Sequence, residues 1–145
     1  MKPRIPIAAW VALGSALGAG ARWGTGIALG AGGAGFPWGT LAVNVAGSAL
    51  IGFYAALVVP GSRFTASPAQ RQFVMAGFCG GFTTFSLFTI ELLEATLQGR
   101  YALAAAILVG SVSAWLVAVT VGYLAGTRLA MRPARAERGD PNHAS

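Results

Sequence analysis

The chain has 145 residues, of which 55% are hydrophobic and only 10% are charged. Soluble domains average about 25% charged residues, so this chain has too little polar surface to live in water. Its ten Lys and Arg residues form no basic helix and no basic patch interleaved with aromatics, which argues against nucleic-acid binding. The composition predicts an all-α integral membrane protein in a lipid bilayer.

Four apolar stretches are long enough to span a bilayer as helices, which takes about 20 residues. They cover residues 5–28, 38–59, 70–97 and 102–125. The first stretch follows two basic residues, as the core of a signal peptide does, but its length fits a retained span.

The chain divides into two parts by composition. Residues 1–127 hold the four spans and are expected to form a four-helix transmembrane subunit. Residues 128–145 are polar and basic, and we expect this tail to be disordered.

Glycines four residues apart recur within the spans. The pairs stand at residues 14 and 18, 20 and 24, and 122 and 126. This spacing lets helix backbones approach closely, so we expect these glycines to serve helix packing.

Two charged side chains stand in apolar context, where a charge at the bilayer centre costs about 2.5–3.5 kcal/mol. Arg22 lies in the first stretch and either snorkels to the interface or serves function. Glu91 in the third stretch shares a helix face with Thr84 and Phe88. Its carboxylate is either neutralised by burial or by an arginine, or belongs to a functional site.

The second stretch carries a polar stripe. Thr40, Asn44, Gly47 and Ser48 fall on one side of the predicted helix. A lone Asn in a membrane helix often only links helices through hydrogen bonds. An amide flanked by hydroxyls and glycine favours a site. Ser111 adds a hydroxyl in the fourth stretch.

The third stretch is interrupted by residues 77–88, which read GFCGGFTTFSLF. Paired glycines and paired threonines predict that the helix is broken near Gly80 and Gly81. Irregular backbone at membrane depth is tolerated only where it is buried or lines a cavity, and membrane proteins place ions at such breaks.

The side chains around this break suit a small ion. Amide, hydroxyl and the electropositive ring edges of Phe85 and Phe88 suit an anion, whereas carbonyls freed at Gly80 and Gly81 suit a hard cation. Physical reasoning alone therefore reaches a small-ion pathway without choosing the ion. No acid–base or nucleophile constellation is present in the sequence, so an enzyme is not expected.

Three blocks closely resemble the signatures of the Fluc (CrcB) fluoride channels. They are GFCGGFTTFS at residues 77–86, GTLAVNVAG at 39–47 and GARW at 20–23. The resemblance covers all four spans in order. It implies a four-helix subunit of an antiparallel, dual-topology dimer in the cell inner membrane. Such a dimer exports fluoride passively, selectively over chloride, and confers fluoride resistance.

The resemblance also implies residue roles. Gly80 and Thr83 would give backbone carbonyls to a structural Na⁺ at the dimer centre. Phe85 and Phe88 would turn their ring edges to fluoride, and Asn44 would be the amide donor in the pore.

The remaining matched positions would continue the polar track. Thr40, Thr84, Ser111 and Glu91 would lie along the fluoride pathway, and Arg22 would lie near the pore vestibule.

Two residues depart from the family pattern on this track. Leu87 stands where a hydroxyl is usual, and Ile107 stands where many members carry a tyrosine. Both substitutions remove a polar group from the expected ion path.

Basic residues are unevenly placed about the four spans. Eight would lie on one side and Arg100 alone on the other, with Arg22 set aside. The eight are Lys2, Arg4, Arg63, Arg71, Arg128, Arg132, Arg135 and Arg138. This bias predicts one fixed orientation with both termini cytoplasmic. It favours pairing with an inverted paralogue, with one degenerate pore, while a homodimer stays open.

Two other functions remain open at this point. A small four-helix multidrug or cation exporter would need a carboxylate in the first helix, where this chain has Arg22. A non-conducting membrane subunit would use its glycines and serines for packing alone, which leaves Asn44 and the broken helix unexplained.

Overall fold

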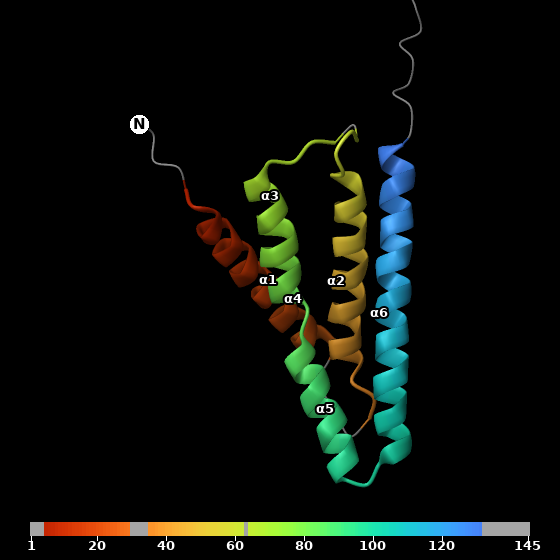
Figure 1. Cartoon of the computed structure of the whole chain (residues 1–145). Coiled ribbons are helices and arrows are strands. Elements are labelled where there is room, and N and C mark those ends of the chain that lie inside the picture. The colour runs from red at the N-terminus through yellow and green to blue at the C-terminus, as the bar shows by residue number, and fades with distance from the viewer. Residues whose placement is uncertain (1–4, 30–34, 63, 132–145) are drawn as a thin grey trace, which may run out of the picture.

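The computed structural model describes residues 5–29, 35–62 and 64–131, and all regular secondary structure in these ranges is helical. The elements in chain order are α1 (Ile7–Leu29), α2 (Trp38–Leu57), α3 (Pro68–Gln72), the π-helical segment η1 (Phe73–Cys79), α4 (Gly80–Phe82), α5 (Phe85–Leu97) and α6 (Tyr101–Ala130). Figure 1 shows α2 and α6 side by side, with the series from α3 to α5 running in the opposite direction.

Three helical segments are long and apolar enough to cross a membrane: α2, the series Pro68–Leu97 and α6. Helix α1 has 23 residues, which suffices for a span by length. Its five glycines and Arg22 make it less apolar than the other three. The predicted all-α membrane architecture is confirmed, and the predicted dimer stays a prediction.

The last helix is longer than expected. Helix α6 continues past residue 125 to Ala130, so Arg128 belongs to its last turn instead of the tail. A basic side chain there is favourable because the C-terminal end of a helix carries partial negative charge. Residues 132–145, predicted to be disordered, lie outside the described residues.

The predicted break in the third span is present, but it falls just after the glycine pair. Gly80 has helical backbone angles (φ −63°, ψ −37°). Thr83 (φ −78°, ψ 160°) and Thr84 (φ −146°, ψ 121°) are extended and separate α4 from α5. The helix therefore continues through the glycine pair and is interrupted at Thr83 and Thr84.

The seven residues of η1 adopt π-helical geometry directly before the break, which nothing in the sequence predicted. Such segments are rare and frequently occur at functional sites. The span is therefore irregular over more of its length than the glycine pair indicated.

Glycines bring two pairs of helices into backbone contact. A Cβ built on Gly18 would lie 2.2 Å from the Phe78 carbonyl oxygen, and one on Gly81 would lie 2.4 Å from that of Ser15. These contacts join α1 to the segment before the break. Between α2 and α6, a Cβ on Gly122 would lie 2.1 Å from the Ala49 carbonyl oxygen.

The packing role predicted for the glycine pairs holds for two of the three. Gly14 and Gly18 are buried in α1, as are Gly122 and Gly126 in α6. Gly20 and Gly24 have nothing within 4 Å of a built Cβ, so within this chain their predicted packing role is wrong. They lie on the side of α1 that turns away from the other helices of this subunit.

We expect Gly122→Ala to destabilise the protein by about 1–3 kcal/mol, because its methyl group would overlap the α2 backbone. Gly110→Ala is the matched control on the same helix, since the nearest atom to its Cβ is a Phe36 ring carbon at 4.0 Å. Thermal unfolding in detergent, followed by size-exclusion chromatography, should show a lower Tm for Gly122→Ala alone. Equal Tm values for the two variants would contradict the packing described.

Candidate functional site

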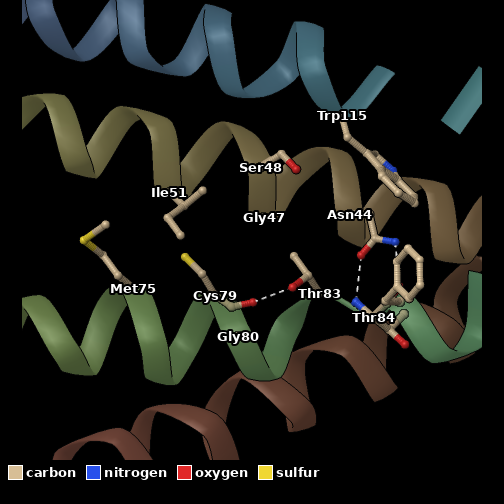
Figure 2. Close-up of a pocket in the computed structure, with 11 residues that line it drawn as sticks. Asn44, Gly47, Ser48, Ile51, Met75, Cys79, Gly80, Thr83, Thr84 and Trp115 are labelled. Atoms are coloured by element: carbon tan, nitrogen blue, oxygen red, sulfur yellow. Dashed lines mark hydrogen bonds between the residues drawn. The ribbon is translucent and has the colours of Figure 1, made fainter. Parts of the chain in front are cut away.

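The break is held by the side-chain amide of Asn44 in α2. Its Nδ2 donates to the Thr84 carbonyl (2.8 Å), and its Oδ1 accepts from the Thr84 backbone N–H (2.7 Å). Both residues are buried, with 5% of each exposed. Figure 2 shows the amide facing the extended backbone between α4 and α5. Asn44 therefore pairs the Thr84 N–H, which the break takes away from its helical acceptor, and adds a donor to the Thr84 carbonyl.

The same contact redirects the backbone of α4. In an unbroken helix the Thr84 N–H would donate to the Gly80 carbonyl. It donates to Asn44 instead, so the Gly80 carbonyl loses its helical donor. Thr84 then begins α5, because its Oγ1 accepts from the Leu87 N–H at 3.2 Å.

Thr83 fits beside α2 because residue 47 is a glycine. A Cβ on Gly47 would lie 2.3 Å from the Thr83 methyl group. The Thr83 hydroxyl donates to the Cys79 carbonyl at 2.9 Å, the acceptor that its own backbone N–H also uses. The hydroxyl is thereby turned back onto α4.

Arg22 reaches the break from α1. Its Nη1 donates to the Thr83 carbonyl at 3.3 Å, and its side chain is half-buried. The sequence left open whether Arg22 snorkels to the membrane interface or serves function. In the structure its guanidinium points to the break and not to the interface. A guanidinium also compensates the partial negative charge where α4 ends.

Thr40 and Glu91 form a second polar contact, one helical turn before Asn44 on α2. The Thr40 hydroxyl donates to Glu91 Oε1 at 2.6 Å. Glu91 Oε2 is buried and has no hydrogen-bond partner in residues 5–29, 35–62 and 64–131. The sequence left open that an arginine neutralises Glu91. In those ranges its carboxyl group is hydrogen-bonded by the Thr40 hydroxyl and by no arginine.

The two predicted phenylalanines do contact each other, at a ring-centroid distance of 5.5 Å. Their environments differ sharply: Phe85 is 69% exposed, whereas Phe88 is 3% exposed. Phe88 also packs edge-on against Trp115 at 4.9 Å. Ser111 lies one turn before Trp115 in α6 and is buried.

A cavity of about 310 Å³ lies at the break and faces α2. It is lined by Asn44, Gly47, Ser48, Ile51, Met75, Cys79, Gly80, Thr83, Thr84, Phe85 and Trp115. Five predicted site residues therefore meet at one cavity, namely Asn44, Gly80, Thr83, Thr84 and Phe85.

The other predicted residues lie around this cavity without lining it. Thr40, Phe88, Ser111 and Glu91 continue on α2, α5 and α6, and Arg22 approaches from α1.

Sequence reasoning missed Trp115 and the cavity residues of η1. A usable signal existed for Trp115, because it stands four residues after Ser111 and therefore on the same helix face. No comparable pattern marks Met75 and Cys79. Both lie in η1, whose π-helical geometry was not predicted.

The groups that could hold a metal ion here are backbone oxygens. In the described part of the chain no three His, Cys, Asp or Glu residues gather at one place. The Gly80 carbonyl has lost its helical donor, and a Cβ on Gly80 would meet nothing within 4 Å. A backbone carbonyl at this cavity is the kind of ligand that a hard cation takes, although one chain supplies only part of a ligand set.

Comparison with known proteins gives a consistent result. The family model described as CrcB-like protein, Camphor Resistance (CrcB), matches residues 9–123. A protein of Rhodopseudomonas palustris named fluoride-specific ion channel FluC 1 is 50% identical over 131 residues, covering 89% of this chain and 92% of that protein. A Bradyrhizobium diazoefficiens protein of the same name is 47% identical over 120 residues, covering 83% and 84%. Fluoride-specific ion channel FluC of Methylocella silvestris is 45% identical over 116 residues, covering 79% and 88%.

We expect Asn44→Ala to loosen the break, because it leaves the buried N–H of Thr84 without its acceptor. A buried unpaired donor costs about 1–3 kcal/mol. Hydrogen exchange of the backbone at residues 83–87 should become faster, with a lower Tm. Ser48→Ala, one turn away on the same face of α2, serves as the control and should leave both unchanged. Unaltered exchange in Asn44→Ala would show that the amide does not hold the break.

Proposed function

The chain belongs to the CrcB-like family, and on that basis we propose that it is a subunit of a fluoride-selective ion channel that lowers cytoplasmic fluoride by passive export. The observation that carries the proposal is the cavity at the break, where an amide, hydroxyls and an exposed phenylalanine ring meet. Membership of an ion-channel family assigns no catalytic reaction to the chain.

The donors at this cavity suit a small anion. The Asn44 amide has two N–H groups. One holds Thr84, and the second has no partner in residues 5–29, 35–62 and 64–131, so it can donate to an ion. The exposed Phe85 ring offers its electropositive edge. Neutral donors can replace the hydration shell of fluoride without binding it as tightly as a fixed cation would, and conduction requires such moderate binding.

The polar track continues away from the cavity along α2 and α5. The hydroxyl of Thr40 bonds the carboxyl of Glu91 one turn before Asn44 on α2, and Phe88 on α5 and Ser111 on α6 are buried. This order supports a path from the exposed Phe85 ring into the subunit. Arg22, held at the Thr83 carbonyl, supplies the positive charge nearest its start.

The break also supports a second subunit in inverted orientation. Phe85 is largely exposed within one subunit, although it belongs to the site. Two inverted copies of the break would bring four carbonyls together, two each from Gly80 and Thr83. Such a set fits a structural Na⁺ at the centre of the assembly, because hard cations take several oxygen ligands.

The distribution of basic residues supports a fixed orientation in the cell inner membrane. Arg71 and Arg128 lie at the end of the molecule where α3 begins and α6 ends, whereas Arg100 lies at the opposite end (Figure 1). Positive residues favour the cytoplasmic side, so both termini are proposed to be cytoplasmic. The second subunit would then be an inverted paralogue, and relatives numbered FluC 1, FluC 3 and FluC 4 accord with several such chains.

The multidrug-exporter alternative is not favoured. Proton-coupled export of cationic drugs would need a carboxylate in the first helix, and α1 contains Arg22 and no acidic residue. The non-conducting alternative leaves the Asn44–Thr84 contact without a purpose, since an unbroken helix would pack without it.

We expect liposomes containing this protein to release fluoride rapidly, read with a fluoride electrode, and to retain chloride. Phe85→Ile should lower the fluoride efflux rate roughly tenfold or more, the effect of removing about 1.4 kcal/mol of stabilisation from the ion. Phe78→Ile is the matched control, because Phe78 stacks on Phe82 at 5.7 Å and does not line the cavity.

Two results would contradict this prediction. Equal loss of efflux in both variants would show that Phe85 has no special role. No fluoride release from the unmodified chain would exclude a self-sufficient channel. Co-expression with an inverted paralogue then decides between a heterodimer subunit, which regains efflux, and a non-conducting protein, which does not.

We also expect Na⁺ to stabilise the assembled protein. An ion bound at about 100 times its dissociation constant adds about 2.7 kcal/mol to the free energy of unfolding. The Tm in NaCl should therefore exceed the Tm in N-methylglucamine chloride of equal ionic strength. Identical Tm values across a wide Na⁺ range would argue against a sodium site formed by Gly80 and Thr83.

A further inference from the structure

One buried donor beside the cavity has no partner. Trp115 Nε1 is inaccessible to water and makes no hydrogen bond within the described ranges, where Glu91 Oε2 is the only other buried side-chain atom in that condition. An indole nitrogen can only donate. Because buried polar groups are nearly always paired in native proteins, an unpaired one calls for an explanation.

The position of Trp115 ties this donor to the ion path. Its indole reaches from α6 towards Asn44 and forms part of the cavity wall (Figure 2). On its other side it packs edge-on against buried Phe88. Trp115 therefore stands where the exposed cavity, lined by Phe85, meets the buried part of the track, which begins at Phe88.

Few other donors are available at this level of the subunit. Ile107 is 1% exposed and packs in the apolar cluster around Phe88, so it offers no polar group. Leu87 is also apolar, and its backbone N–H is used by Thr84. On α6 the donors that face this region are the Ser111 hydroxyl and, one turn later, the Trp115 indole.

We propose that Trp115 Nε1–H donates a hydrogen bond to fluoride as the ion passes from the Phe85 ring to the Phe88 ring, a role that rests on the proposed fluoride conduction. Nε1 is covered in the structure, so contact requires rotation of the Trp115 or Phe88 ring about its side-chain torsions. Fluoride is small and a strong acceptor, so a single well-placed N–H favours it over chloride.

The opposite role for the same ring is that Trp115 blocks the path by its bulk. The two roles predict changes of opposite sign. Trp115→Phe removes the N–H and keeps an aromatic ring, so it isolates the donor. Trp115→Ala removes the ring as well, so it relieves any blockage.

The first experiment reads the donor directly. The protein carries four tryptophans, and ¹⁵N-labelled indoles in lipid nanodiscs should give one N–H signal for each. Trp115→Phe assigns the signal of Trp115. On titration with sodium fluoride this signal should move downfield and saturate, while sodium chloride leaves it in place. A Trp115 signal that stays fixed at saturating fluoride would overturn the proposal.

The second experiment measures fluoride efflux from liposomes. Trp115→Phe should lower the initial rate roughly tenfold, as expected for loss of a hydrogen bond to a charged group. Trp10→Phe is the matched control, because Trp10 also packs edge-on on a phenylalanine, Phe73, and lies outside the cavity. Unchanged efflux in Trp115→Phe, or faster efflux in Trp115→Phe or Trp115→Ala, would overturn the proposal, the latter in favour of a blocking ring.

Failure of the conduction proposal gives a different pattern. If the unmodified chain releases no fluoride but its Trp115 signal still responds to fluoride, Trp115 binds the ion and the conduction proposal is wrong. Normal efflux with a fixed Trp115 signal would remove the binding role alone. If the chain releases no fluoride and its Trp115 signal does not move, both the conduction proposal and the Trp115 proposal are wrong.

Discussion

The structure depends on the pair of hydrogen bonds between the Asn44 side chain and the Thr84 peptide groups. The Thr84 N–H has lost its helical acceptor, and at membrane depth no water is available to replace it. Asn44 supplies a donor and an acceptor in the geometry of a backbone partner. The break at Thr83 and Thr84 can therefore persist at membrane depth. The lost helical donor of the Gly80 carbonyl and the start of α5 at Thr84 accompany this break.

Close backbone packing makes this contact possible. Gly47 admits the Thr83 methyl group against α2, and Gly81 lets the same segment press against Ser15 of α1. The broken span is thus held between α2 and α1. Arg22 of α1 donates a hydrogen bond to the Thr83 carbonyl at the break. Small residues, one arginine and the Asn44 amide therefore fix the backbone at the break.

The sequence predicted the helices and most of the site because each rests on a local pattern. The length of the apolar stretches predicted the spans. The i, i+4 stripe put Thr40 and Asn44 on one side of the second span, and in the structure both contact the third span. The break was displaced by three residues because glycine suggests unwinding, whereas here its small size serves packing. The π-helical segment and the partners of Arg22 and Glu91 depend on how α1, α2 and α5 meet, and no local pattern encodes that.

The most direct test of this account is an experimental structure of the assembled protein in lipid with sodium fluoride. We expect extended backbone at Thr83 and Thr84, with the Asn44 amide bonded to both Thr84 peptide groups. We also expect ion density beside the second Asn44 N–H and the Phe85 ring edge. A continuous helix through residues 83 and 84, or a break that the Asn44 amide does not contact, would contradict it.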